Sequence, residues 1–211
     1  MVDKKGNYPK TMDEIDDNFF EDDDDLKDFG LDGDGDNSKN EEEINEDYTI
    51  RIFGLDNSGK STLMMSLINP VEGNVPELSE DFTADAMVYQ KANINLFDIS
   101  GKKTYREYWK NFFHSSDGFI FVIDASDTKR IEEAKIALKS IIQLEDNKDI
   151  PLLIYANKID LLNNKYDAEK LWKDLDLNKS DNIFIQACSS KKLTGLKEGF
   201  EWLFKKVKIE Y

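Results

Sequence analysis

The chain has 211 residues, 39% of them hydrophobic, and a formal net charge of −16 at pH 7. Its length suffices for one domain with a full core, and a single cysteine, Cys188, excludes an internal disulfide. The acidic balance argues against nucleic acid as a partner, and no run of about eighteen apolar residues could span a membrane, so we expect a cytoplasmic protein.

The N-terminal segment, residues 1–47, holds 19 of the 44 acidic residues but only 5 of the 28 basic ones, a net charge of −14. This composition predicts an acidic, low-complexity and disordered extension ahead of a globular domain of residues 48–211. Apolar residues between 11 and 29 recur at a rough helical spacing, so a partner-binding helix or a segment that folds over the domain is the alternative. Val2 excludes N-myristoylation, so any membrane association would be peripheral and without that lipid.

A glycine-rich octet, residues 54–61, follows the strand-like run 48–53 and precedes the helix-like run 62–68. Its glycines let the backbone curl, so that N–H groups and the helix N-terminus can bind phosphate oxygens. Lys60 supplies a positive charge for the β- and γ-phosphates, and the Ser61 hydroxyl can ligate the bridging Mg²⁺. The predicted nucleotide contacts here are Gly54, Asp56, Asn57, Ser58, Gly59, Lys60, Ser61 and Thr62.

Beyond this loop, short apolar runs alternate with helical patterns, which predicts an α/β domain with a mostly parallel, doubly wound sheet. We expect strands at 94–97, 118–124, 151–156 and 183–187. Helices are expected at 128–144, 168–175 and 196–207, where apolar residues recur with a period of about 3.6. Polar residues stand at the strand ends, where ligands bind in open α/β sheets: Asp98, Asp124, Asn157 and Ser189.

The tetrapeptide Asn157-Lys-Ile-Asp160 follows the strand expected at 151–156 and indicates recognition of guanine, the alternative being an ordinary polar turn. Asp160 can accept hydrogen bonds from both N–H groups of the guanine N1/N2 edge, whereas adenine presents an acceptor there. Lys158 would lie along the base plane, and Asn157 would brace the phosphate loop. Backbone N–H groups that could donate to guanine O6 belong to Ser189, Ser190 and Lys191.

The tetrapeptide Asp98-Ile-Ser-Gly101 follows the strand expected at 94–97. Asp98 is placed to hold Mg²⁺ through water, and the Gly101 N–H can bond to a γ-phosphate. Loss of that contact when the γ-phosphate is absent would switch the conformation of the following segment. The expected cofactors are therefore GTP or GDP and Mg²⁺.

From Tyr48 onward the chain resembles the Arf and Arf-like small GTPases. The resemblance implies a Ras-like P-loop G domain, GTP/GDP exchange with Mg²⁺, and a monomer that recruits effectors in vesicular or ciliary transport. Ser100, where most members have glycine, is most similar to the ciliary coat-recruiting branch. The segments that carry the resemblance are Gly54–Lys60, Asp98–Gly101, Tyr105–Trp109, Phe121–Asp127 and Asn157–Asp160.

Three aromatic residues, Phe82, Phe97 and Phe112, have the spacing of the triad that effectors of this family contact. The resemblance implies that effectors, exchange factors and activating proteins bind through these aromatics and the switch regions. The alternative is that all three are core residues.

Lys102 stands where the family has the glutamine that orients the attacking water. Lysine has three donors and no acceptor, so it cannot hold water as an amide does. We therefore expect a GTPase with very slow intrinsic hydrolysis, at or below about 10⁻⁴ s⁻¹. The alternative is a pseudo-GTPase, a binding module that holds its nucleotide constitutively and acts as a scaffold.

Two further segments depart from the family. Counting back from Asp98 places the switch I hydroxyl for Mg²⁺ on Ser79, with Thr83 as the alternative. Glu80 and Asp81 bring negative charge near the phosphates, which should weaken closure. The acidic residues at 32–43 resemble a calcium-binding loop, which makes a calcium-sensing regulator a third hypothesis, although the segment lacks the turn glycine of such loops.

Overall fold

Six strands form one sheet in the computed structural model, which describes residues 46–73, 82–143, 149–162 and 166–208. The strand order is β2-β3-β1-β4-β5-β6. Neighbouring strands are parallel except β2, which is antiparallel to β3. The strands are β1 Glu46–Gly54, β2 Phe82–Tyr89, β3 Ala92–Ile99, β4 Gly118–Asp124, β5 Leu152–Asn157 and β6 Ile183–Ala187.

The mostly parallel sheet and its predicted strands are confirmed, with two corrections. Strand β2 was not predicted from the sequence. Strand β1 begins at Glu46, two residues before the strand-like run predicted at 48–53, because Glu46 and Asp47 pair with β3. The rest of the predicted extension, including residues 32–43, and the predicted Mg²⁺ ligand Ser79 lie outside the described residues.

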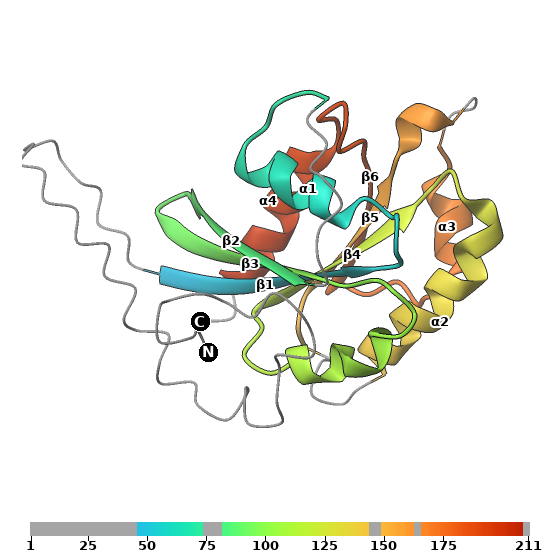
Figure 1. The fold of residues 1–211 in the computed structure, drawn as a ribbon, viewed down its shortest axis with the longest axis horizontal. Coiled ribbons are helices and arrows are strands. Elements are labelled where there is room, and N and C mark those ends of the chain that lie inside the picture. The colour runs from blue at the N-terminus through green and yellow to red at the C-terminus, as the bar shows by residue number, and fades with distance from the viewer. Residues whose placement is uncertain (1–45, 74–81, 144–148, 163–165, 209–211) are drawn as a thin grey trace, which may run out of the picture.

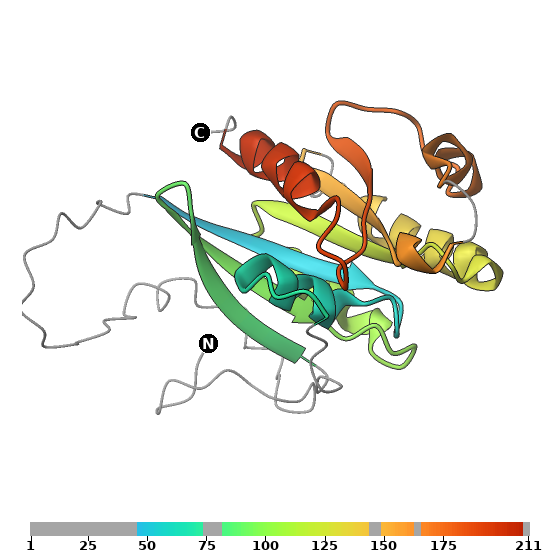
Figure 2. The same ribbon diagram turned by 90° about the horizontal axis from the view of Figure 1, so that it is seen from above.

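Helices cover both faces of the sheet (Figures 1 and 2). Helices α1 and α4 lie on one face, and α2 lies on the other face with the 3₁₀ helix η3, as Figure 1 shows. The predicted helix at 196–207 has the predicted bounds, and the helix expected at 128–144 is divided into η4 and α2. The helices are α1 Lys60–Ile68, η3 Arg106–Phe112, η4 Thr128–Arg130, α2 Ile131–Ile142, η6 Ile159–Leu161, α3 Ala168–Asp174 and α4 Leu196–Val207.

The hydrophobic core consists of two clusters, one on each face of the sheet. Leu63 of α1 and Phe200 of α4 pack in one cluster, and Leu138 of α2 packs in the other. The central strands are buried on both faces, which explains the continuous apolar run Phe119–Ile123 in β4. These two layers of helices hold the strands in register and so fix the positions of the strand ends.

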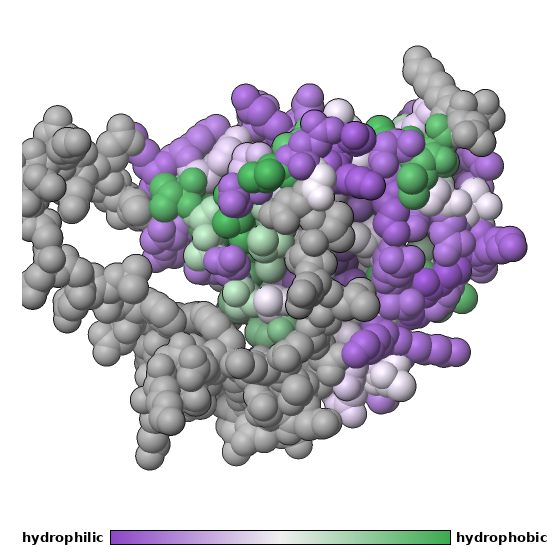
Figure 3. Space-filling model, turned by 45° about the horizontal axis from the view of Figure 1, so that its top comes forward, coloured by the Kyte–Doolittle hydropathy of each residue, from purple (hydrophilic) through white to green (hydrophobic). Residues whose placement is uncertain are grey.

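The carboxyl ends of the parallel strands meet at one edge of the sheet. Gly54 pairs with Val122, and Asp124 pairs with Asn157, so the phosphate loop and the guanine tetrapeptide lie at the same edge. No helix among the described residues has the length and hydropathy needed to cross a membrane. On the face drawn in Figure 3, hydrophobic residues lie in small groups among hydrophilic ones.

Candidate functional site

The phosphate loop between β1 and α1 requires both of its glycines. Gly54 has a φ of 144°, and a Cβ there would lie 2.3 Å from the Val122 carbonyl oxygen. Gly59 has a φ of 94°, and a Cβ there would lie 2.4 Å from Asn157 Nδ2. The backbone is therefore held against β4 on one side and against the end of β5 on the other, in a conformation that other residues rarely adopt.

Lys60 is buried at the first position of α1. The residue is 7% exposed, and its Nζ donates to the Leu55 carbonyl 3.0 Å away. Burial lowers the pKa of Lys60, while the negative charge of Asp98 opposes that shift. Thr62 follows two residues later in the first turn of the same helix. A buried cation at a helix N-terminus is a suitable contact for phosphate oxygens.

Ser61 and Asp98, which the sequence predicts to be Mg²⁺ ligands, are in contact. The Ser61 hydroxyl donates to Asp98 Oδ2 at 2.5 Å, and Asp98 is 3% exposed. Its second oxygen, Oδ1, is buried and has no hydrogen-bond partner among the described residues. Burial raises the pKa of Asp98, with Lys60 opposing it. A buried carboxylate oxygen without a donor, beside a hydroxyl, fits a hydrated divalent cation.

Gly101 lies directly against the phosphate loop. Its carbonyl oxygen accepts from Asp56 N at 3.1 Å and from Arg106 Nε at 2.9 Å. A Cβ at Gly101 would lie 2.3 Å from the Gly54 carbonyl oxygen, so only glycine fits. Lys102, the next residue, is exposed, and its Nζ lies 5.7 Å from the centre of the Tyr105 ring. The predicted γ-phosphate sensor thus touches the loop that would hold the phosphates.

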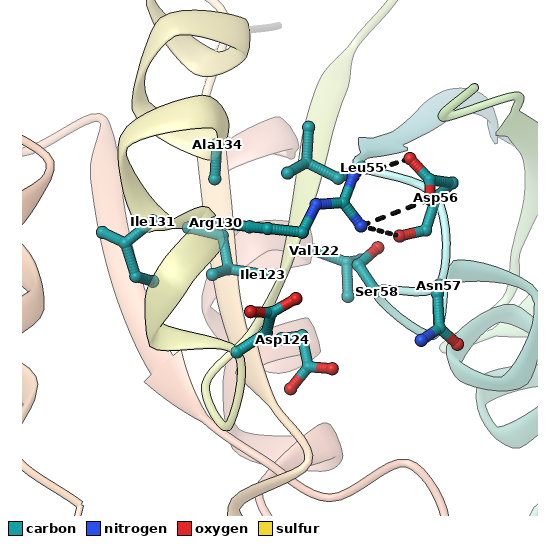
Figure 4. A pocket seen from close by; sticks show the side chains of 11 residues that line it. Leu55, Asp56, Asn57, Ser58, Val122, Ile123, Asp124, Arg130, Ile131 and Ala134 are labelled. Carbon is teal, nitrogen blue, oxygen red and sulfur yellow. Dashed lines mark hydrogen bonds and ion pairs between the residues drawn. The ribbon is translucent and has the colours of Figure 1, made fainter. Parts of the chain in front are cut away.

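Four charged side chains gather beside the phosphate loop, and this cluster was not predicted from the sequence. Arg130 reaches from the end of η4, just before α2, to Asp56, where Nη2 lies 2.7 Å from Oδ1 (Figure 4). Arg106 also bonds to Asp56, and both arginines bond to Glu133. The hydrogen bonds from the two arginines lower the pKa of Glu133 to about 2, and the bond from Arg130 has the larger effect. Only the Arg130–Glu133 spacing of three residues is visible in the sequence.

Asn157 braces the phosphate loop, as predicted. Its Nδ2 donates to the Ser58 carbonyl at 3.1 Å, and its Oδ1 accepts from the backbone N–H and the hydroxyl of Ser190, each at 3.0 Å. Asn157 is 2% exposed. One amide therefore joins the phosphate loop to the loop that follows β6.

Lys158 has a φ of 65° and lies along the phosphate loop. Its Nζ donates to the Asn57 carbonyl at 2.5 Å and lies 2.8 Å from Asp124 Oδ2. Burial would raise the pKa of Asp124, but the hydrogen bonds from Lys158 and Ser126 outweigh that effect, so the pKa is lowered. The strand ends of β4 and β5 are thereby tied to the loop.

The loop after β6 holds the remaining predicted base contacts. Ser189 donates through its hydroxyl to Asp160 Oδ1 at 2.5 Å. The backbone N–H groups of Ser189 and Ser190 are already used, because they donate to Thr194 O and to Asn157 Oδ1. The Lys191 N–H donates to no acceptor among the described residues. Of the three predicted backbone donors, it is therefore the one that remains for guanine O6.

The predicted effector-binding aromatics form one buried cluster. Phe82, Phe97 and Phe112 are 5%, 8% and 1% exposed. The Phe82 ring lies 5.9 Å from that of Phe97 and 5.7 Å from that of Phe112, and the Arg51 guanidinium lies 4.9 Å from the Phe97 ring centre. In this conformation all three are core residues, which is the alternative stated above.

The chain matches the ADP-ribosylation factor family over residues 37–207. It is 40% identical over 169 residues to ADP-ribosylation factor-like protein 3 of Chlamydomonas reinhardtii, covering 75% of this chain and 90% of that relative. It is 36% identical over 161 residues to ADP-ribosylation factor-like protein 2 of Arabidopsis thaliana, covering 75% of this chain and 86% of that relative. The solved structure of the Arl6 BBS3 small GTPase from Trypanosoma brucei, with the bound nucleotide analogue GppNp, is similar with a TM-score of 0.69 and 27% identity, covering 78% of this chain and 99% of that one.

Proposed function

The chain belongs to the ADP-ribosylation factor family of small GTPases, and from this premise we propose that it is a GTP/GDP switch that recruits effector proteins in vesicular or ciliary transport. The observation that supports a switch most directly is the contact of Gly101 with the phosphate loop. Because the Gly101 carbonyl accepts from both Asp56 N and Arg106 Nε, displacing Gly101 also displaces Arg106 and the helix η3 that it begins.

We assign the roles at the phosphate end as follows. Lys60 binds the β- and γ-phosphates with the ammonium that now donates to Leu55 O. Ser61 ligates Mg²⁺, Asp98 holds it through water, and Ser79 is the proposed third contributor. Mg²⁺ supplies positive charge between the two phosphates when it is bound. The contacts of the loop itself are those predicted for residues 54–62.

At the base end, we assign the choice of guanine to Asp160, whose carboxylate would accept from the N1 and N2 donors. The Ser189 hydroxyl, which already donates to Asp160, orients that carboxylate. Lys158 lies along the base, and the Lys191 N–H donates to O6. Ser190 acts through Asn157 instead of contacting the base.

Partner recognition through Phe82, Phe97 and Phe112 requires these buried rings to become exposed. We propose that the switch does this by moving β2 and β3 relative to η3, since the triad bridges these elements. The large apolar side chains already exposed in this region are Val88 of β2 and Tyr108 of η3.

Nucleotide content and exchange test this proposal against the pseudo-GTPase alternative. Purified protein is analysed for bound nucleotide and then mixed with fluorescent GDP or GTP analogues, with and without Mg²⁺. A switch binds and exchanges both nucleotides, and removal of Mg²⁺ speeds their release. A scaffold shows no exchange or no bound nucleotide, and either result would refute the switch.

A further inference from the structure

The loop after α1 and the loop after β6 meet beside the residues proposed to read guanine. The Gly73 N–H donates to the Lys191 carbonyl at 2.9 Å, and Lys192 Nζ lies 2.9 Å from Glu72 Oε1. Figure 1 shows the two loops coming together at the top of the view. We call these four residues, Glu72, Gly73, Lys191 and Lys192, the clasp.

The clasp is directly bonded to the groups proposed to read the base. Lys192 N donates to the Ser189 hydroxyl oxygen at 3.1 Å, and that hydroxyl donates to Asp160. The carbonyl that accepts from the Gly73 N–H belongs to Lys191, the residue whose own N–H remains for guanine O6. Any shift of Lys191 or Lys192 therefore moves both the O6 donor and the support of the Asp160 carboxylate.

The loop after β6 is also held by buried contacts with the end of β5 and with helix α1. Ser190 bonds to Asn157 at the end of β5, and its carbonyl accepts from the Ser66 hydroxyl of α1 at 3.0 Å. Ser190 and Asn157 are both buried. The clasp is the exposed part of this attachment, because the Lys192 and Glu72 side chains are 53% and 61% exposed.

We propose that Glu72 and Gly73 are positioning residues that hold the 189–192 loop against the bound guanine and so set the lifetime of the nucleotide complex. This inference rests on the proposed function, since it requires a guanine nucleotide at Asp160. It gives the loop after α1 a role in nucleotide release. A partner that displaces residues 69–73 would loosen the base from a distance and without touching the nucleotide.

The size of the effect follows from the exposure of the pair. Exposed ion pairs contribute little and are screened by salt, so loss of the Glu72–Lys192 pair should speed release by roughly twofold to fivefold. Gly73 offers an independent test, because its φ is 79° and a Cβ there would meet nothing within 4 Å. Gly73→Ala therefore disfavours the backbone conformation without a clash, and a similar acceleration of about threefold to fivefold is expected.

The experiment measures release of fluorescent GDP from the full chain, with Mg²⁺ present and unlabelled GDP in excess. The variants are Glu72→Gln, Lys192→Gln, Gly73→Ala and the exchanged pair Glu72→Lys with Lys192→Glu. Lys179→Gln is the matched control, since it breaks an ion pair of similar length and exposure, 2.8 Å to Glu169, away from the clasp. The first three variants should release GDP faster, the exchanged pair should recover part of the wild-type lifetime, and the control should release GDP at the wild-type rate.

Salt separates a positioning role from a general loss of stability. Raising the ionic strength should bring the wild-type release rate toward that of Glu72→Gln and change the variant much less, while the unfolding temperatures of the two stay equal. Normal loading with unchanged release in Glu72→Gln and Gly73→Ala would overturn this inference alone. Failure of the wild type to load any guanine nucleotide would overturn the proposed function and this inference together.

Discussion

A single carboxylate, Asp160, carries the proposed choice of guanine. In Asp160→Asn the side chain presents one acceptor and one donor, which no longer matches the two donors of guanine but matches the N–H and carbonyl of xanthine. We expect GDP affinity to fall by roughly 100-fold or more and xanthine nucleotide to bind in preference, because a polar group left unpaired against the bound base is costly. Competition of GDP and XDP against a fluorescent nucleotide measures both changes.

Asp167→Asn is the control for this substitution, because Asp167 caps helix α3 and asparagine caps a helix equally well. It should leave both affinities unchanged. An Asp160→Asn protein that binds GDP as tightly as the wild type would contradict the assignment of the base-reading residue.

Lys102 carries the prediction of slow hydrolysis. In Lys102→Gln an amide that can both donate and accept replaces an ammonium, so the variant should orient water and hydrolyse GTP at least about 10-fold faster than the wild type. Single-turnover hydrolysis of loaded GTP measures the rate. Lys103→Gln is the matched control, because Lys103 is the adjacent exposed lysine. Equal rates in the wild type and Lys102→Gln would show that position 102 does not limit hydrolysis.

The predicted site residues that the structure describes are close together because they lie in the phosphate loop or in the turns that follow strand ends, whereas Ser79 lies outside the described residues. Their individual hydrogen bonds were less accessible from sequence. Ser190 matched a base-contact pattern, yet its N–H donates to Asn157, since that amide needs a buried partner on each side. Such a choice between a ligand and a neighbour depends on distances that spacing alone does not give.

At the level of elements, the Asp56–Arg106–Arg130–Glu133 cluster ties the phosphate loop to η3 and α2. The folded-state pKa of Glu133, about 2, lies below its ordinary value of 4.5. Its stabilising contribution is therefore complete above pH 4.5 and is lost as the pH falls from 4.5 toward about 2. The Glu133 side chain is 38% exposed, so screening by solvent reduces the expected contribution to about 1 kcal/mol.

Glu133→Gln should accordingly lower the free energy of unfolding by about 1 kcal/mol near pH 7, with a smaller difference near pH 3.5. Chemical denaturation at the two pH values measures it. Glu132→Gln is the control, because the Glu132 side chain is 70% exposed and, within the described part of the chain, pairs only with Lys135, at 3.6 Å. A difference that stays constant with pH would mean that ionisation of Glu133 is not the cause.

The elements predicted best are those with strong apolar patterns, and the strand that was missed has a weak pattern. Strands β4 and β6 and helix α4 were predicted with their observed bounds. Strand β2 is an edge strand with one fully buried residue, Phe82, and Asp85 and Ala86 on its exposed positions. Strand β2 is stabilised by its pairing with β3. Such pairing cannot be predicted from the intrinsic strand propensity of its own residues.

Across the whole molecule, alternation of strands and helices sufficed to predict where distant segments meet. In a parallel sheet the carboxyl ends of all strands lie at one edge, so residues from 54 to 191 could be assigned to one site. The Asp56–Arg106–Arg130–Glu133 cluster could not be predicted in this way, because it joins segments through long side chains instead of through strand ends. The clasp could not be predicted either, because it joins two loops and not two strand ends.

The start of the globular domain, which composition predicts at Tyr48, can be tested by truncation. Glu46 pairs with Ala92 in the sheet, and its carboxylate accepts from the Tyr48 hydroxyl at 3.0 Å and lies 3.2 Å from Lys208 Nζ. Composition assigned Glu46 and Asp47 to the acidic extension because both are negatively charged. We propose that the domain begins at Glu46.

A chain that begins at Glu46 should therefore unfold at the temperature of the full chain, whereas one that begins at Tyr48 should lose about 1–2 kcal/mol and unfold several degrees lower. Thermal unfolding of the three proteins, each loaded with GDP, measures this. Glu46→Gln in the chain that begins at Glu46 keeps the backbone pairing and removes the charge, so it should lie between the two truncations. Equal unfolding temperatures for both truncations would place the start of the domain at Tyr48, because Glu46 and Asp47 would then contribute nothing to its stability.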